Sequence, residues 1–243
     1  MRGGTWRYSP VPMLNLAPIQ AISLDLDDTL WPVWPAIERA EATLLQWLGD
    51  HAPATVARFP TTLALRAVRE ELELERPDLR HDLSTLRLES IRRALRHAGD
   101  DPAWAEEAFE VFFAARQRVD FYPDALPALA RLAARFPLVA LSNGNADVHR
   151  VGVGHLFHAA VSAREFGVAK PDPRIFHAAA SAAQVAPEAV LHVGDDPLMD
   201  VVGGAGAGMQ TVWVNRGGHT WDHPVQPHLH VVELGALCQA LGI

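Results

Sequence analysis

Residues 21–29 read AISLDLDDT, a short apolar run that ends in three carboxylates and a threonine. A run of this length is typical of a strand buried on both faces of a parallel sheet, so we predict a strand over residues 21–26. Asp25 and Asp27 alternate along it and would share one face. The stretch therefore places acidic side chains at the carboxyl end of a strand.

The chain that follows changes in character twice. From about residue 31 to residue 120 only helical signals occur, such as the capping aspartate and first-turn proline of Asp101-Pro102. From Tyr122 onwards strand and helix patterns alternate, which indicates right-handed crossovers and a parallel sheet. The predicted further strands cover 138–141, 158–162, 189–193, 211–214 and 229–232, and the predicted helices between them cover 124–136, 146–155, 173–184 and 196–207. The expected fold class is α/β, a Rossmann-like open parallel sheet with an inserted all-helical cap domain.

The expected domain organisation has three parts. Residues 19–30 and 121–243 form the Rossmann-like catalytic core, and residues 31–120 form the helical cap. Residues 1–18 show no helical or strand period and no apolar core of a signal peptide, so we expect a loose N-terminal extension.

The composition is typical of a folded globular protein and argues against several other classes of protein. The chain has 243 residues, is 49% hydrophobic and carries 21 Lys+Arg against 29 Asp+Glu, which excludes wholesale disorder. An acidic chain without a Lys/Arg block is a poor nucleic-acid binder, and no apolar run reaches the roughly 18 residues of a membrane span. The single cysteine, Cys238, excludes an internal disulfide or a CxxC site, and the cytoplasm is the expected compartment.

Polar residues follow several of the predicted strands. In an open parallel sheet, ligands lie outside the carboxyl ends of the strands, so these residues are expected to converge. They are Asp25, Asp27, Asp28 and Thr29 after the first strand; Ser142, Asn143 and Gly144 after the second; Lys170 in a loop; and Asp195, Asp196 and Asp200 after the fourth.

This set of residues suits phosphoryl chemistry. Crowded carboxylates repel one another unless a cation is present, and Mg²⁺ is the hard cation that prefers carboxylate oxygens. A phosphoryl group needs cations and donors, here Lys170, the hydroxyls of Thr29 and Ser142, and the amides near Asn143 and Gly144. A carboxylate can attack phosphorus to form an aspartyl-phosphate, and a second one can protonate the leaving oxygen and then deprotonate water.

Four segments, in order, resemble the motifs of the haloacid-dehalogenase-like hydrolases. DLDDT at 25–29 resembles DxDxT, and LSNG at 141–144 resembles the second motif. KPDPRIF at 170–176 resembles KPxPxIF, and GDDPLMD at 194–200 resembles the acidic GDxxxxD. The resemblance covers roughly residues 20–215, and the helical insert matches the family's cap by position and type.

The resemblance implies a role for each matching residue. Asp25 would be the nucleophile and Asp27 the general acid/base, while Ser142 and Lys170 would hold the phosphate. Mg²⁺ would be held by Asp25, the backbone carbonyl of Asp27, and Asp195. Asp200 would support the metal, its waters or Lys170, and Asp196 is a further candidate ligand.

The acid at position 27 separates the possible reactions. The family's dehalogenases lack an acid there because halide leaves without a proton. We therefore expect a Mg²⁺-dependent phosphatase of a small soluble phosphomonoester, of the sugar phosphate, nucleotide or flavin nucleotide type. A phosphomutase or a non-catalytic phosphate-binding member of the same fold is the alternative. The expected partner is a small phosphorylated metabolite, with no nucleic acid and no membrane, and the chain is a monomer or homodimer.

A pair of tryptophans and a group of four histidines each allow more than one interpretation. Trp31 and Trp34 either pack at the cap junction or wall the substrate pocket, and Trp31 is a substrate-binding candidate. His219, His223, His228 and His230 could form a transition-metal site. Prolines interrupt their spacing, so we expect an ordinary loop.

Overall fold

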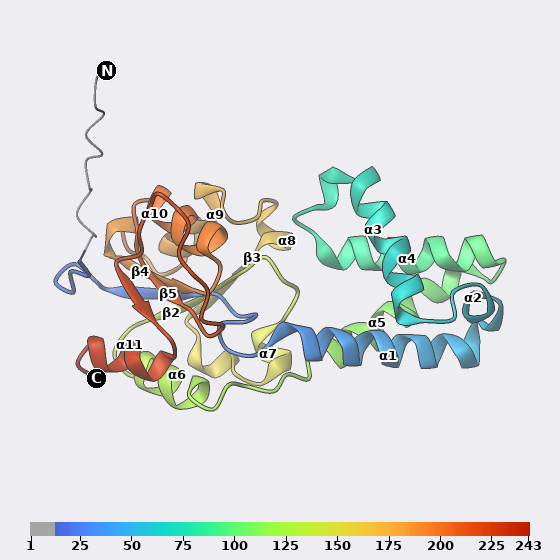
Figure 1. Cartoon of the computed structure of the whole chain (residues 1–243), viewed down its shortest axis with the longest axis horizontal. Helices are drawn as coiled ribbons and strands as arrows, with labels where there is room; N and C mark the ends of the chain where they lie inside the picture. The colour runs from blue at the N-terminus through green and yellow to red at the C-terminus, as the bar shows by residue number, and fades with distance from the viewer. Residues whose placement is uncertain (1–12) are drawn as a thin grey trace, which may run out of the picture.

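The computed structural model describes residues 13–243, and within them six strands form one sheet of order β3-β2-β1-β4-β5-β6 (Figure 1). Every neighbouring pair is parallel. The strands are β1 (Ala21–Leu24), β2 (Leu138–Ser142), β3 (Ala159–Ser162), β4 (Val190–Gly194), β5 (Gln210–Val214) and β6 (Leu229–Val231). The predicted fold class, an open parallel α/β sheet with an inserted helical segment, is confirmed.

Strand β1 occupies the point where the strand order reverses. It pairs with β2 on one side and β4 on the other, and all four of its residues are buried. Its side chains alternate, with Ile22 and Leu24 in one core cluster and Ala21 in another. The crevice outside such a reversal is where open α/β sheets bind ligands, so the topology places the end of β1 at a candidate site.

The chain turns sharply after β1, which ends two residues earlier than predicted. Asp28 adopts a φ of 57°, and its amide donates to the carbonyl of Trp31 at 2.7 Å. Its Oδ1 accepts from the amide of Val33, the first residue of α1, at 2.9 Å. Asp28 therefore closes the turn and caps the first helix of the insert.

Two sets of helices cover the two faces of the sheet (Figure 1). Helices α6 (Ala125–Ala133), α7 (Val148–Val151) and α11 (Leu234–Ala240) contribute to one core, and α8 (Ala163–Phe166) and α9 (Pro173–Ala182) contribute to the other. A π-helical turn, Pro197–Val202, leads into α10 (Gly203–Gly206), and short 3₁₀ turns cover Gly154–Leu156 and Pro187–Ala189. Both faces are thus buried, as a parallel sheet requires.

The helix predicted over 146–155 is much shorter in the structure. The Asp147 carboxylate accepts from the amides of His149 and Arg150, so the helix begins only after this cap. Gly152, with a φ of 97°, ends it at Val151.

The insert is a bundle of five helices, in order α1 (Val33–His51), α2 (Pro53–Arg58), α3 (Thr62–Glu75), α4 (Leu83–Ala98) and α5 (Ala105–Arg116). Short 3₁₀ turns, Pro77–Leu79 and Pro102–Trp104, precede α4 and α5. The bundle lies beside the sheet (Figure 1) and has its own apolar cluster, which includes Leu44, Leu95 and Phe112. The exact domain boundaries predicted at residues 31 and 120 stay a prediction.

The predicted N-terminal extension is only partly described. Residues 1–12 lie outside the described residues. Asn15 is anchored, because its amide donates to the Gln210 side chain and its carbonyl accepts from the same side chain, both at 2.7 Å. Within residues 13–243 no helix has the length and apolar character needed to cross a membrane.

The insert's own core predicts a large effect of truncating Leu44, which is 1% exposed. Leu44→Ala is expected to lower the free energy of unfolding by about 2–5 kcal/mol, because a buried cavity replaces the lost methyl groups. Urea denaturation followed by circular dichroism measures it. Leu63→Ala, on the 68%-exposed side chain of α3, is the matched control and should change stability by at most about 0.5 kcal/mol. Equal effects of the two variants would contradict a packed core around Leu44.

Candidate active site

A buried lysine joins two carboxylates at the carboxyl ends of β1 and β4. The Lys170 ammonium donates to Asp25 Oδ1 and to Asp200 Oδ1, each at 2.6 Å. Burial lowers the pKa of Lys170, but the charges of Asp200 and Asp25 outweigh it and raise that pKa. Lys170 is therefore a fixed positive charge next to the end of β1.

The position of Lys170 is set by residues on both sides of it. The Asn143 side chain accepts from the Lys170 amide at 2.7 Å and donates to the Lys170 carbonyl at 3.0 Å. On the other side, α9 anchors the loop through Ile175 and Phe176, both fully buried against the sheet. The Asn143 side chain thus holds the lysine backbone, and the contact of phosphate with the amides near Asn143 stays a prediction.

Asp200 is held by a buried network as well as by Lys170. His192 Nε2 lies 3.1 Å from Asp200 Oδ1, and His192 Nδ1 lies 2.8 Å from the Ser23 hydroxyl. A Cβ on Gly194 would sit 2.2 Å from the Asp200 carboxyl carbon, so glycine is needed for this approach. Burial raises the pKa of Asp200, but Lys170 and His192 outweigh it and lower that pKa, so Asp200 is ionised.

Three carboxylates gather around this lysine. Asp25, Asp195 and Asp200 each have an oxygen within 4.8 Å of the others, and Thr29 donates to Asp195 at 3.1 Å. Burial, followed by the charges of Asp200 and Asp28, raises the pKa of Asp195 to about 7. Burial also raises the pKa of Asp25, although Lys170 opposes it. One ammonium among three carboxylates leaves excess negative charge, and the all-oxygen donor set fits a hard divalent cation.

Asp27 lies apart from this cluster and faces the loop after β2. A Cβ on Gly144 would sit 2.4 Å from Asp27 Oδ2, so only glycine allows the carboxylate to lie against this loop. Asp27 Oδ1 accepts from Trp31 Nε1 at 2.8 Å, and Arg116 Nη2 donates to Oδ1 and Oδ2 at 2.6 and 2.7 Å. Arg116 belongs to the insert, so this contact joins insert and sheet.

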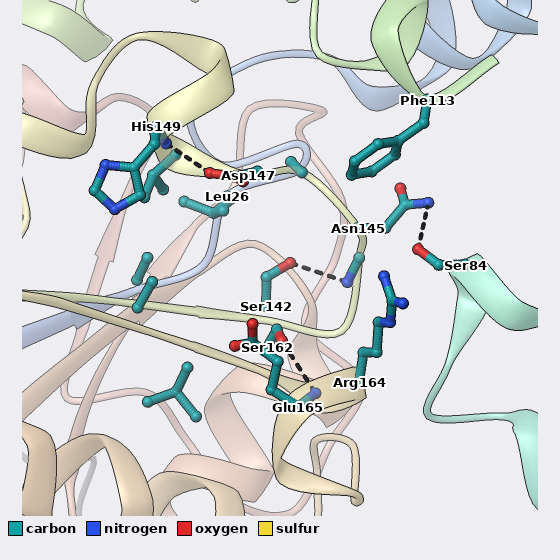
Figure 2. A pocket seen from close by; sticks show the side chains of 16 residues that line it. Leu26, Ser84, Phe113, Ser142, Asn145, Asp147, His149, Ser162, Arg164 and Glu165 are labelled. Atoms are coloured by element: carbon teal, nitrogen blue, oxygen red, sulfur yellow. Dashed lines mark hydrogen bonds between the residues drawn. The ribbon is translucent and has the colours of Figure 1, made fainter. Parts of the chain in front are cut away.

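A cavity of about 640 Å³ adjoins the same loop. Figure 2 shows Ser142 on one side of it and Ser84 of α4 on the other, with Asn145 and Arg164 between them. Phe113 of α5 adds an aromatic wall. The Ser142 hydroxyl accepts from the Gly144 amide at 2.9 Å and keeps its own proton for another acceptor. The cavity thus reaches from the end of the sheet to the insert.

Three of the expected ligand contacts are not where the sequence placed them. Trp31 is fully buried, edge-on to Phe121 at 5.2 Å between ring centroids, so it offers no surface as a pocket wall. Asp196 caps the π-helical turn by accepting from the amides of Leu198 and Met199, and it lies outside the acidic cluster. Thr29 is fully buried and bonds a carboxylate, which leaves no face toward a phosphate.

The C-terminal histidines are spread over separate contacts. His228 accepts from the Thr211 amide at 3.1 Å, and His230 stacks on Trp213 at 4.6 Å between centroids. Across residues 13–243, the one group of acidic, histidine or cysteine side chains close enough to share an ion is Asp25, Asp195 and Asp200. His230 lies in β6, and the expectation that these histidines bind no metal stays a prediction.

Sequence reasoning missed Arg116 and His192. Arg116 falls four residues after the buried Phe112, so a charged residue continues the apolar stripe of α5. His192 interrupts the apolar sequence of β4, in which every residue is buried. A charged or polar residue at a position that periodicity assigns to a core is the signal that could have found both.

Comparison with known proteins places this geometry in context. The family model of the haloacid dehalogenase-like hydrolases matches residues 19–208. The 5-amino-6-(5-phospho-D-ribitylamino)uracil phosphatase of Escherichia coli strain K12 is 34% identical over 91% of this chain and 96% of its own. The phosphoserine phosphatase of Thermus thermophilus is 41% identical over 59% of this chain and 60% of its own.

Solved structures are also similar. The 2-haloacid dehalogenase from Pseudomonas syringae pv. tomato DC3000 superimposes with a TM-score of 0.84, with 38% identity over 92% of this chain and 98% of that one. A HAD phosphatase from Thermococcus onnurineus superimposes with a TM-score of 0.63 at 22% identity, over 92% of this chain and 98% of that one, and shares the fold.

The raised pKa of Asp195 predicts how stability depends on pH without metal. The folded pKa of about 7 exceeds the usual 3.8, so the folded state binds the extra proton between these values. The stabilisation from the protonated Asp195 carboxyl is therefore fully present below about pH 4, and it is lost as the pH rises through 7. In EDTA, Asp195→Asn should stabilise the protein at pH 8 by on the order of 1–3 kcal/mol, and by much less at pH 4. Urea denaturation at both pH values measures it.

The same variant tests the cation site. Added divalent cation should raise the Tm of the wild type and of Asp196→Asn, because Asp196 lies outside the cluster. It should leave the Tm of Asp195→Asn unchanged. An equal increase in all three proteins would show that the cation binds elsewhere.

Proposed function

The chain belongs to the haloacid dehalogenase-like hydrolases, and on that basis we propose that it is a Mg²⁺-dependent phosphatase of small phosphomonoesters. The observation that carries the proposal is the pair of carboxylates at the end of β1. Asp25 is fixed by Lys170, and Asp27 stands free of that lysine, so the two can perform different tasks. Two carboxylates in different surroundings are the arrangement that divides nucleophile from acid/base.

Asp25 is proposed as the nucleophile. Lys170 bonds its Oδ1, whereas its Oδ2 has only a 3.5 Å contact with the Thr29 hydroxyl. The lysine thus orients the carboxylate and offers positive charge beside an incoming phosphoryl group. Attack of an Asp25 oxygen on phosphorus breaks the ester P–O bond and forms an aspartyl-phosphate.

Asp27 is proposed as the general acid and then the general base. Its carboxyl proton goes to the leaving ester oxygen in the first step. In the second step its carboxylate takes a proton from water, whose oxygen attacks phosphorus and releases the Asp25 carboxylate with inorganic phosphate. Ser142 lies beside Asp27 across Gly144 and has a hydroxyl proton to donate to a phosphoryl oxygen.

The acidic cluster fits the metal that this chemistry uses. Asp25 and Asp195 are proposed as the carboxylates that hold Mg²⁺, with Asp200 behind them bonded to Lys170. When bound, Mg²⁺ supplies positive charge to carboxylate and phosphoryl oxygens. Asp195 suits this role because Thr29 is its side-chain hydrogen-bond donor and no arginine or lysine pairs with it within the described residues.

The proposed substrate is a small phosphorylated metabolite. The cavity of about 640 Å³ next to Ser142 has the volume of a small-molecule site and combines an aromatic wall, Phe113, with polar groups. The relatives from Escherichia coli and Thermus thermophilus are named for phosphorylated small molecules, a ribitylaminouracil and serine. Sugar phosphates, nucleotides and flavin nucleotides are the classes to screen.

Dehalogenation is the second candidate, because the Pseudomonas syringae structure carries that name at 38% identity. Two features of this site favour phosphate esters instead. A halide leaves without a proton and gives Asp27 no task, and the raised pKa of Asp195 marks an excess of negative charge that a cation would offset.

Phosphate release from p-nitrophenyl phosphate tests the proposal. Wild type is expected to turn over with Mg²⁺ and to stop with EDTA. Asp25→Asn should fall to the background rate because an amide cannot form the acyl phosphate. Asp50→Asn, an exposed aspartate at the far end of α1, is the matched control and should match wild type. Turnover by Asp25→Asn at the wild-type rate would refute the nucleophile.

Halide release separates the two candidates. With 2-chloropropionate, the same preparation is expected to release no chloride above the rate of Asp25→Asn. Chloride release by wild type without phosphate release, lost in Asp25→Asn, would establish the dehalogenase in place of the phosphatase. Ion chromatography measures chloride, and a colorimetric assay measures phosphate.

A further inference from the structure

Arg116, the last residue of α5, reaches from the insert into the site. Its side chain is 1% exposed, and Nη2 donates to both oxygens of Asp27. We propose that Arg116 is a positioning residue that holds the Asp27 carboxylate in place to deprotonate water in the second half of the reaction. The inference rests on the proposed phosphatase function.

The burial of Arg116 argues for a role beyond packing. Its Nε and Nη1 are buried without a hydrogen-bond partner. A buried donor without a partner is unfavourable, because it has lost its hydrogen bonds to water, and most buried polar groups are therefore hydrogen-bonded. The Arg116 guanidinium is buried although two of its nitrogens lack a partner, and it pairs with a single carboxylate. We take its task to be to hold that carboxylate in place. Within the described residues, that carboxylate belongs to Asp27.

The hydrogen bonds of Asp27 show how its carboxylate is held. Oδ1 of Asp27 accepts from Trp31 and Arg116, and Oδ2 accepts from Arg116. Both oxygens accept hydrogen bonds, so the Arg116 guanidinium and the Trp31 indole together fix where the Asp27 carboxylate lies. This arrangement matches the step in which Asp27 takes a proton from water, the water oxygen bonds to phosphorus, and the bond from phosphorus to the Asp25 oxygen breaks.

The end of α5 is tied to the sheet by a second residue. Gln117 Nε2 donates to the Asn145 carbonyl at 3.2 Å, and Gln117 Oε1 accepts from the Asp147 amide at 2.8 Å. These bonds attach the end of α5 to the loop after β2, which also carries Gly144 against Asp27. The position of the insert therefore fixes where the Arg116 guanidinium lies relative to Asp27.

Pre-steady-state kinetics with p-nitrophenyl phosphate test the role. p-Nitrophenolate leaves readily and needs little help from an acid, so loss of Arg116 should slow only hydrolysis of the aspartyl-phosphate. Arg116→Met should give a burst of p-nitrophenolate near one equivalent per active site. Its kcat should fall about 10- to 100-fold, part of the roughly 10²–10⁴-fold that a general base contributes. KM should fall with it, and kcat/KM should stay within about threefold of wild type.

Two further variants complete the experiment. Arg118→Met, on an exposed arginine two residues on, is the matched control and should behave as wild type. Arg116→Lys keeps one positive charge and should recover part of kcat with a smaller burst, and it serves if the methionine variant does not fold. Equal losses of kcat and kcat/KM without a burst, or no loss, would overturn the role of Arg116. Absence of turnover in wild type would instead overturn the phosphatase proposal itself.

Discussion

The ammonium of Lys170, buried between Asp25 and Asp200, is the interaction on which the site depends. It donates to both buried carboxylates at 2.6 Å, and its charge lowers the pKa of Asp200 and opposes the increase that burial causes in the pKa of Asp25. Breaking such a pair from one side would leave an uncompensated buried charge, which is strongly destabilising. The third carboxylate, Asp195, has no such partner, and its raised pKa records the unbalanced charge. The excess negative charge around Asp195 therefore lowers the stability of the folded protein without metal, and the same charge favours the binding of a cation.

Residues of the surrounding fold hold Lys170 and Asp200 in position. Asn143 holds the backbone of Lys170 from β2, and the buried face of α9 holds the loop from the other side. His192 fixes Asp200 from within β4, with Ser23 of β1 behind it. Three neighbouring parallel strands and the loops and turns after them thus supply both the charged groups and the neutral groups that orient them. Parallel strands end at one edge of the sheet, which is why a few residues from distant parts of the chain can form one site.

The insert supplies side chains to the candidate site. Arg116 bonds Asp27, and Ser84 and Phe113 line the cavity beside Ser142. The carboxylate of Asp27, the proposed acid/base, is therefore held by a helix that does not belong to the sheet. A change in the position of α5 would alter the contacts of Asp27 while leaving Asp25 on Lys170. In the proposed mechanism, the position of the insert therefore affects Asp27, whereas the contact between Asp25 and Lys170 does not involve the insert.

The sequence alone determined the parallel α/β class, the helical insert and the residues at the strand ends, because buried strands and amphipathic helices have distinct periods and the motifs lie next to them. It could not assign the contacts of those residues. Asp196, beside Asp195, caps a helical turn, and Trp31 is buried in the core, since neighbours in sequence can point in opposite directions. The sequence shows Arg116 and His192 as charged or polar residues at core positions, but it does not show their partners, Asp27 and Asp200, which they meet only in the folded structure. The local sequence pattern determines the helices and strands, and tertiary packing alone decides which charged side chains become neighbours.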